Sequence, residues 1–135
     1  MASTNKNSFS LLPRDIASTI PLFNSEENNE KEDLLVYAHL FGVIGDWYIC
    51  QISEDFKTAF GFKNIYSESE WEMDKWIKNE KDWGTFSIEY LQKLVNEEFL
   101  KEKDIRFLIV RDIYWKETKF SDLNIERSTL NYPGI

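Results

Sequence analysis

Two runs rich in aromatic and aliphatic residues, 34–41 and 46–53, are separated by only four residues. Runs of this length and composition, bounded by glycine, are typical of β-strands, and the short link predicts that they pair as a hairpin. Because side chains on a strand alternate between its two faces, the first strand places Leu35, Tyr37, His39 and Phe41 on one face. Residues 58–62 predict a third, short strand.

Helical signals occur on both sides of this hairpin. Pro13 is expected in the first turn of a short helix that Pro21 ends near residue 19. Ser87 is expected to cap a second helix, preceded by a short strand or extended turn at 84–86. The buried side of the first helix should comprise Leu12, Ile16, Ile20 and Leu22, and the buried stripe of the second should comprise Ile88, Leu91, Leu94, Val95 and Phe99. The last strand is predicted over residues 105–114.

A further helix is predicted over residues 68–78. Ser67 and Glu70 match a capping box, and Tyr66 with Trp71 matches a hydrophobic staple. Acidic residues near the start of this helix and lysines near its end suit the helix dipole.

This order of elements predicts a fold class of α+β: a single domain with a small antiparallel β-sheet and two to three helices packed on it. A chain of 135 residues is expected to form one domain. We expect a flexible N-terminus over 1–8, the α+β domain over 9–120, and a C-terminal tail over 121–135 that packs loosely.

Composition and motifs exclude several function classes. The net charge of −8 argues against direct nucleic-acid binding, which needs a basic surface. Cys50 is the only cysteine, so an intrachain disulfide is impossible and a reducing compartment is expected. Without a long apolar run or a leader, we expect a cytoplasmic protein with no membrane partner. Neither a glycine-rich phosphate loop nor a metal-ligand spacing around His39 occurs, so no cofactor and no metal are expected.

The stretch Ile109 to Trp115 sets two opposite charges, Arg111 and Asp112, among apolar residues. A charge removed from water needs a partner. In one reading Arg111 pairs with an acid such as Asp46 or Glu89 under the rings of Trp47, Trp83 and Trp115, and Asp112 caps or orients a loop. In the other, Arg111 holds an anionic ligand or a partner's carboxylate in a pocket. The candidate pocket residues are Trp47, Arg111, Asp112, Tyr114 and Trp115.

His39 and Cys50 have simpler interpretations. His39 is expected to be a packed or half-exposed strand residue. Cys50 is expected to be buried as a small hydrophobe. The two could meet across adjacent strands, but no oxyanion signature supports catalysis by such a pair.

Four motifs occur in an order that resembles a known family, the small bacterial and mobile-element proteins grouped as domain of unknown function 2958. The motifs are Leu11-Leu12-Pro13, Trp47-Tyr48, Trp83-Gly84-Thr85-Phe86-Ser87 and Arg111-Asp112-Ile113-Tyr114-Trp115. The resemblance covers residues 9–120, although the segment 68–78 is longer here than in the usual pattern. It implies no activity. It does imply a setting, as accessory cargo of plasmids and phages, often near antirestriction genes.

These observations favour a small acidic, non-enzymatic binding protein of a mobile element. It would inhibit a host nucleic-acid-targeting defence complex, of the anti-CRISPR or antirestriction type, by occupying a basic groove. The expected contact residues are Glu68, Glu70, Trp71, Glu72, Asp74 and Trp76. The alternatives are a small-ligand-binding or enzymatic domain with a pocket around Arg111, and a structural subunit that self-associates through exposed aromatic residues.

Overall fold

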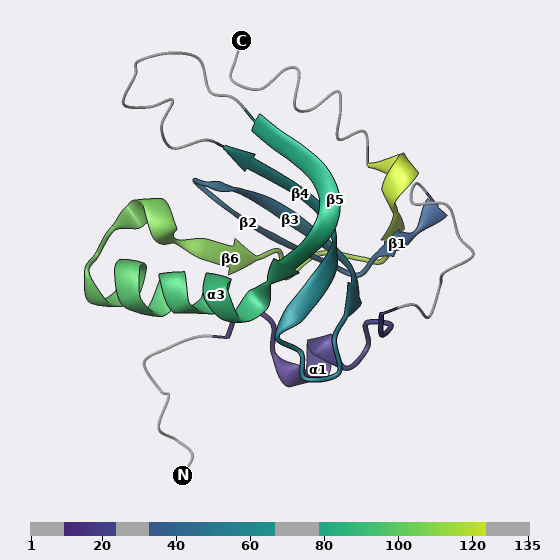
Figure 1. The fold of residues 1–135 in the computed structure, drawn as a ribbon, viewed down its shortest axis with the longest axis horizontal. Coiled ribbons are helices and arrows are strands. Elements are labelled where there is room, and N and C mark those ends of the chain that lie inside the picture. Colours follow the sequence, from purple (N-terminus) through teal and green to yellow (C-terminus); the bar gives the residue numbers. More distant parts are fainter. Residues whose placement is uncertain (1–9, 24–32, 67–78, 124–135) are drawn as a thin grey trace.

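The computed structural model describes residues 10–23, 33–66 and 79–123 (Figure 1). Its main sheet is antiparallel and has the strand order β5-β4-β3-β2-β6, and β1 and β7 form a separate two-stranded ribbon. The strands are β1 (Leu35–Val36), β2 (Ala38–Gly42), β3 (Gly45–Ile52), β4 (Thr58–Tyr66), β5 (Asn79–Ser87), β6 (Ile109–Arg111) and β7 (Thr118–Lys119). The α-helices are α1 (Arg14–Ala17) and α3 (Ile88–Lys93). The α+β fold class expected from the sequence is therefore confirmed.

The predicted hairpin is the centre of the sheet. Strands β2 and β3 pair from Ala38↔Ile49 to Gly42↔Gly45, which leaves a two-residue turn. The two strands beyond β3 are longer than expected, because β4 and β5 each run for nine residues. The short strands predicted at 58–62 and 84–86 are the paired ends of this long hairpin.

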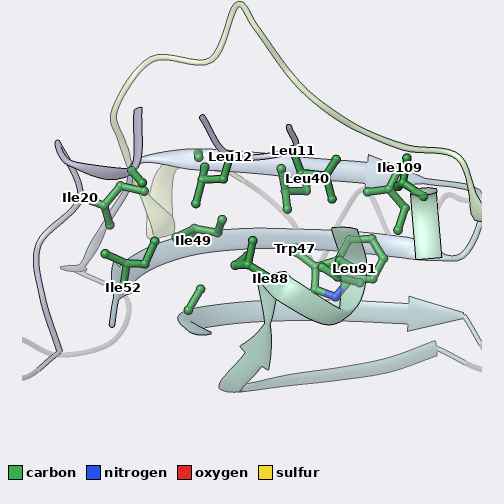
Figure 2. Close-up of a cluster of buried hydrophobic side chains, with 14 residues drawn as sticks. Leu11, Leu12, Ile20, Leu40, Trp47, Ile49, Ile52, Ile88, Leu91 and Ile109 are labelled. Carbon is green, nitrogen blue, oxygen red and sulfur yellow. The ribbon is translucent and has the colours of Figure 1, made fainter. Parts of the chain in front are cut away.

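The helices cover one face of the sheet and bury the larger core with it (Figure 2). Leu40 and Ile49, in the two central strands, are fully buried in this core. The other members are Leu11, Leu12, Ala17, Ile20, Ala38, Trp47, Ile52, Ala59, Ile88, Leu91, Val95 and Ile109. Two helical segments far apart in the chain therefore share one apolar layer, as their sequence patterns predicted.

The helix that follows β5 begins where the sequence predicted. The Ser87 hydroxyl accepts a hydrogen bond from the N–H of Tyr90 at 2.9 Å, which satisfies a donor of the first turn. The helix continues beyond α3 as a π-helical segment, η3 (Leu94–Lys101). Ile88, Leu91 and Val95 are buried as expected.

The other face of the sheet carries a second, aromatic cluster. Leu34, Val36 and Cys50 are buried in it, and the partly buried Tyr48, Phe60, Trp83, Trp115, Phe120 and Leu123 pack against them. The ribbon β1–β7 and the 3₁₀ turn η5 (Phe120–Asp122) contribute to this cluster. Cys50 is thus a buried apolar residue, as the sequence indicated.

Several element boundaries differ from those predicted. The strand expected over 105–114 is only β6, because residues 105–107 form a 3₁₀ turn, η4 (Ile105–Phe107), and the chain turns after Arg111. The first helix is shorter than expected and has Pro13 as its N-cap residue. Leu22 is 43 % exposed rather than buried. The predicted helix 68–78 and its capping box lie outside the described residues.

Within the described ranges, no helix has both the length and the apolar character that crossing a bilayer requires.

Gly61 and Gly84 face each other across β4 and β5 and provide a matched pair of substitutions. A Cβ at Gly61 would overlap the carbonyl oxygen of Tyr48, whereas a Cβ at Gly84 would meet nothing within 4 Å. Gly61→Ala should therefore lower the free energy of unfolding by about 1–3 kcal/mol, the usual cost of overpacking, and Gly84→Ala should not. Urea denaturation of both variants measures this difference, and equal stabilities would contradict the close approach of β3 and β4.

Candidate functional site

A cavity of about 460 Å³ lies between the end of α1 and the segment that follows β6. We call it the Arg111 cavity. Its volume is within the range of small-molecule sites. It is lined by Ile16, Thr19, Tyr37, Ala38, Arg111, Asp112, Ile113, Trp115, Lys116 and Glu117.

The sheet positions Arg111 at the end of its edge strand. Arg111 pairs with Leu40 of β2, and the N–H of Asp112 donates to the carbonyl oxygen of His39 at 3.0 Å. The Asp112 carboxylate then accepts the N–H of Tyr114 at 3.0 Å, and the Asp112 carbonyl accepts the N–H of Trp115. This Asx-type turn ends the strand and sends the chain away from the sheet. Asp112 thus orients a loop, as one of the two readings expected.

Trp115 forms a fixed wall of the Arg111 cavity. Its indole N–H donates to the carbonyl oxygen of Val36 at 2.9 Å, which ties the segment after β6 to β1. Its ring lies 5.3 Å from that of His39 and 6.2 Å from that of Tyr48, measured between centroids. Since the N–H is already bonded, Trp115 offers the cavity ring surface.

The ion pairs predicted for Arg111 with Asp46 or Glu89 are not formed. Asp46 pairs with His39, with 2.9 Å between Oδ1 and Nε2, and Glu89 lies 3.7 Å from the ammonium group of Lys57. Among the described residues, no carboxylate lies within ion-pair distance of the Arg111 guanidinium. Nor does a tryptophan stack on it there, since the cation–π contacts in the described ranges belong to Arg14 and Arg106.

The structure brings together three of the five predicted pocket residues. Arg111, Asp112 and Trp115 line the Arg111 cavity, whereas Trp47 lines a different cavity beside α3. Tyr114 is 84 % exposed and lines neither cavity. The prediction failed for Tyr114 because it extended the strand through this residue, and for Trp47 because β2 lies between β3 and β6 in the sheet. The predicted contact residues Glu68, Glu70, Trp71, Glu72, Asp74 and Trp76 all lie outside the described residues.

A histidine–carboxylate pair on the aromatic face was not foreseen. The ring of His39 stacks on that of Tyr48, with centroids 4.4 Å apart and planes 3° apart, and its Nε2 meets Asp46. Burial and the nearby Asp46 carboxylate raise the pKa of the Tyr48 phenol above its usual range. This pair could have been predicted from the register of the hairpin, which places His39 opposite Tyr48 and Phe41 opposite Asp46. The pair lines neither the Arg111 cavity nor the cavity beside α3.

The described residues include no cluster of three or more histidine, cysteine, aspartate or glutamate side chains that could hold a metal ion.

Comparison with protein-family models, with curated proteins and with solved structures finds no match to this chain. The resemblance to the domain of unknown function 2958 therefore stays a prediction from the four motifs.

Tyr48 should make the stability of the protein sensitive to alkali. The pKa of Tyr48 is higher in the folded than in the unfolded chain. Its contribution to the free energy of unfolding is therefore complete below about pH 10 and is lost as the pH rises above that value. Tyr48→Phe should therefore lose less stability than the unmodified protein between about pH 10 and 12. Urea midpoints across this range measure the effect.

Tyr114→Phe is the control, because Tyr114 is exposed. It should follow the unmodified protein at every pH. If Tyr48→Phe also did so, the burial of the Tyr48 hydroxyl beside Asp46 would be refuted.

Proposed function

We propose that this chain is a binding protein that holds a small anionic molecule in the Arg111 cavity. The observation that carries the proposal is a guanidinium that lines a cavity of about 460 Å³ and has no acidic partner among the described residues. This is the alternative that the sequence left open, with the pocket now confined to Arg111, Asp112, Trp115 and their neighbours.

The chemistry of the lining favours a carboxylate or phosphate group. A guanidinium presents a planar set of donors that matches two oxygens of such a group at once. Arg111 is partly buried, so an anion that pairs with it would offset the cost of removing its charge from water. Lys116 adds a second positive charge to the lining, and Tyr37 and Trp115 add aromatic surface for an apolar part of the ligand.

The acidic residues of the lining limit what can bind. Asp112 is engaged in the turn to Tyr114, so one of its oxygens is already bonded. Glu117 also lines the cavity and would repel a multiply charged anion. A compact ligand with a single carboxylate or phosphate group fits this arrangement best.

We propose a binding role without catalysis. Covalent or general-base chemistry needs a nucleophile and a base within hydrogen-bond reach of each other. The described lining of the Arg111 cavity contains no histidine or cysteine, its Thr19 hydroxyl donates to the carbonyl oxygen of Ile16, and its Asp112 carboxylate is bonded to the N–H of Tyr114. The His39–Asp46 pair is engaged with the aromatic rings of the opposite face.

Arg111→Gln should weaken the binding of small anions. Acetate and inorganic phosphate serve as probes, titrated against ¹⁵N-labelled protein while the amide signals of residues 111–117 are followed by NMR. Loss of a charge-assisted contact is worth about 1.5–3 kcal/mol, so the dissociation constant of the bound probe should rise at least about tenfold.

Arg14→Gln is the matched control, since Arg14 is exposed and does not line the cavity. It should bind the probes as the unmodified protein does. Equal weakening by Arg14→Gln and Arg111→Gln would indicate non-specific attraction and would contradict a site at Arg111, as would the absence of saturable shifts for both probes.

A second proposal rests on the distribution of charge in the sequence. The chain carries a net charge of −8, and Glu68, Glu70, Glu72 and Asp74 fall within seven residues, next to Trp71 and Trp76. We propose that this acidic segment occupies a basic groove of a nucleic-acid-handling defence complex, as an anti-CRISPR or antirestriction inhibitor does. The resemblance to a mobile-element family supports the setting.

Reversal of these four charges to lysine should abolish binding to such a complex. The measurement is a pull-down with the tagged protein from a host lysate, washed at low and then high salt, with competition by duplex DNA. The control reverses the exposed Glu54, Glu97, Glu102 and Asp122 instead. Capture of the same complex by both charge-reversed proteins would refute the proposal for this segment.

A further inference from the structure

A second cavity, of about 440 Å³, lies between the sheet and α3. Strands β3, β4 and β5 contribute one wall, and Leu91 and Leu94 contribute the opposite wall from the helix side. We call it the Trp47 cavity. It shares no lining residue with the Arg111 cavity, so what it binds is independent of the function proposed above.

Trp47 contributes a hydrogen-bond donor to the lining of this cavity. Trp47 is only 2 % exposed and belongs to the apolar core, where its indole nitrogen is the one polar side-chain atom of the cluster drawn in Figure 2. No described residue accepts a hydrogen bond from this N–H. The contrast with Trp115 is sharp, because the indole N–H of Trp115 is bonded to the carbonyl of Val36. The N–H of a buried tryptophan usually finds an acceptor, so an acceptor supplied by a ligand would complete the site.

A positive charge lies beside this donor. Lys63 is the residue directly opposite Trp47 on β4, so both side chains are on the same face of the sheet. Lys63 makes no ion pair with a described residue, and the neighbouring Asp82 carboxylate accepts the backbone N–H of Trp83. The lining of the Trp47 cavity includes no acidic residue, which distinguishes it from the Arg111 cavity.

The remaining lining is largely apolar. Phe86, Leu91 and Leu94 present ring and aliphatic surface, and the Ser87 hydroxyl is engaged as the cap of α3. One end of the occupant must therefore be apolar, and the other must bear a negative charge that can also accept a hydrogen bond.

We propose that the Trp47 cavity binds a small apolar carboxylic acid. The carboxylate pairs with the Lys63 ammonium group and accepts the Trp47 indole N–H. The hydrocarbon part lies against Phe86, Leu91 and Leu94. A neutral molecule of the same shape leaves the Lys63 charge uncompensated, and an amine places a second positive charge beside it.

Octanoate, octanol and octylamine test the proposal as probes of equal chain length and different head group. Each is titrated against ¹⁵N-labelled protein, and the indole N–H signal of Trp47 is followed by NMR, with the signal of Trp115 as an internal reference. Octanoate should shift the Trp47 signal saturably and leave the Trp115 signal unchanged. Octylamine should not compete with octanoate.

Lys63→Gln provides the variant test, because Lys63 is partly exposed and its replacement should not prevent folding. In this variant the dissociation constant of octanoate should rise about tenfold, the effect of losing one charge-assisted contact. The dissociation constant of octanol should change by no more than about twofold. Arg111→Gln should bind octanoate as the unmodified protein does.

Three results would overturn the proposal: no saturable shift of the Trp47 signal, equal affinity for octanoate and octylamine, or loss of octanoate binding in Arg111→Gln but not in Lys63→Gln. The last result would place octanoate in the Arg111 cavity instead.

Discussion

Leu40, in the middle of β2, is the residue on whose pairing the arrangement of the molecule depends. It is fully buried and lies opposite Trp47 of β3 on one side and opposite Arg111 of β6 on the other. Because directly opposed residues of antiparallel strands project to the same face, this one position places a buried indole and a guanidinium on the helix-covered face. Each of these groups lines its own cavity. A slip of one residue in the register would move both to the aromatic face and remove both candidate sites.

The parts of the fold that local chemistry determines could be predicted from the sequence. The hairpin followed from two apolar runs and a short link, and the helix after Ser87 followed from its cap and its buried stripe. The end of the last strand could not be predicted from alternation, because the Asp112 carboxylate competes for the N–H of Tyr114 and ends the strand at Arg111. The aromatic cluster on the second face depends on contacts between segments that are far apart in the chain, such as Trp115 with Val36.

Only part of the candidate site could be predicted, because the rest also depends on contacts between segments that are far apart in the chain. The charged residue among apolar neighbours drew attention to Arg111, and three of the five predicted pocket residues, Arg111 included, line one cavity. The partner acids were wrong, since Asp46 lies in the hairpin beside His39 and is held by it. Sequence spacing gives the face on which a side chain lies, but it does not say which of several acids comes within reach. That choice depends on register and tertiary packing.

Anion binding at Arg111 is tested most directly by the behaviour of its own side chain. The Nε–H signals of the arginines, observed in ¹⁵N-labelled protein during titration with acetate or inorganic phosphate, report on each guanidinium separately. The Arg111 signal should shift saturably with one of these anions, while the signal of Arg106, already bonded to Asp104, stays constant. An Arg111 signal that does not respond, or that moves together with those of all other arginines, would contradict the assignment of this cavity as an anion-binding site.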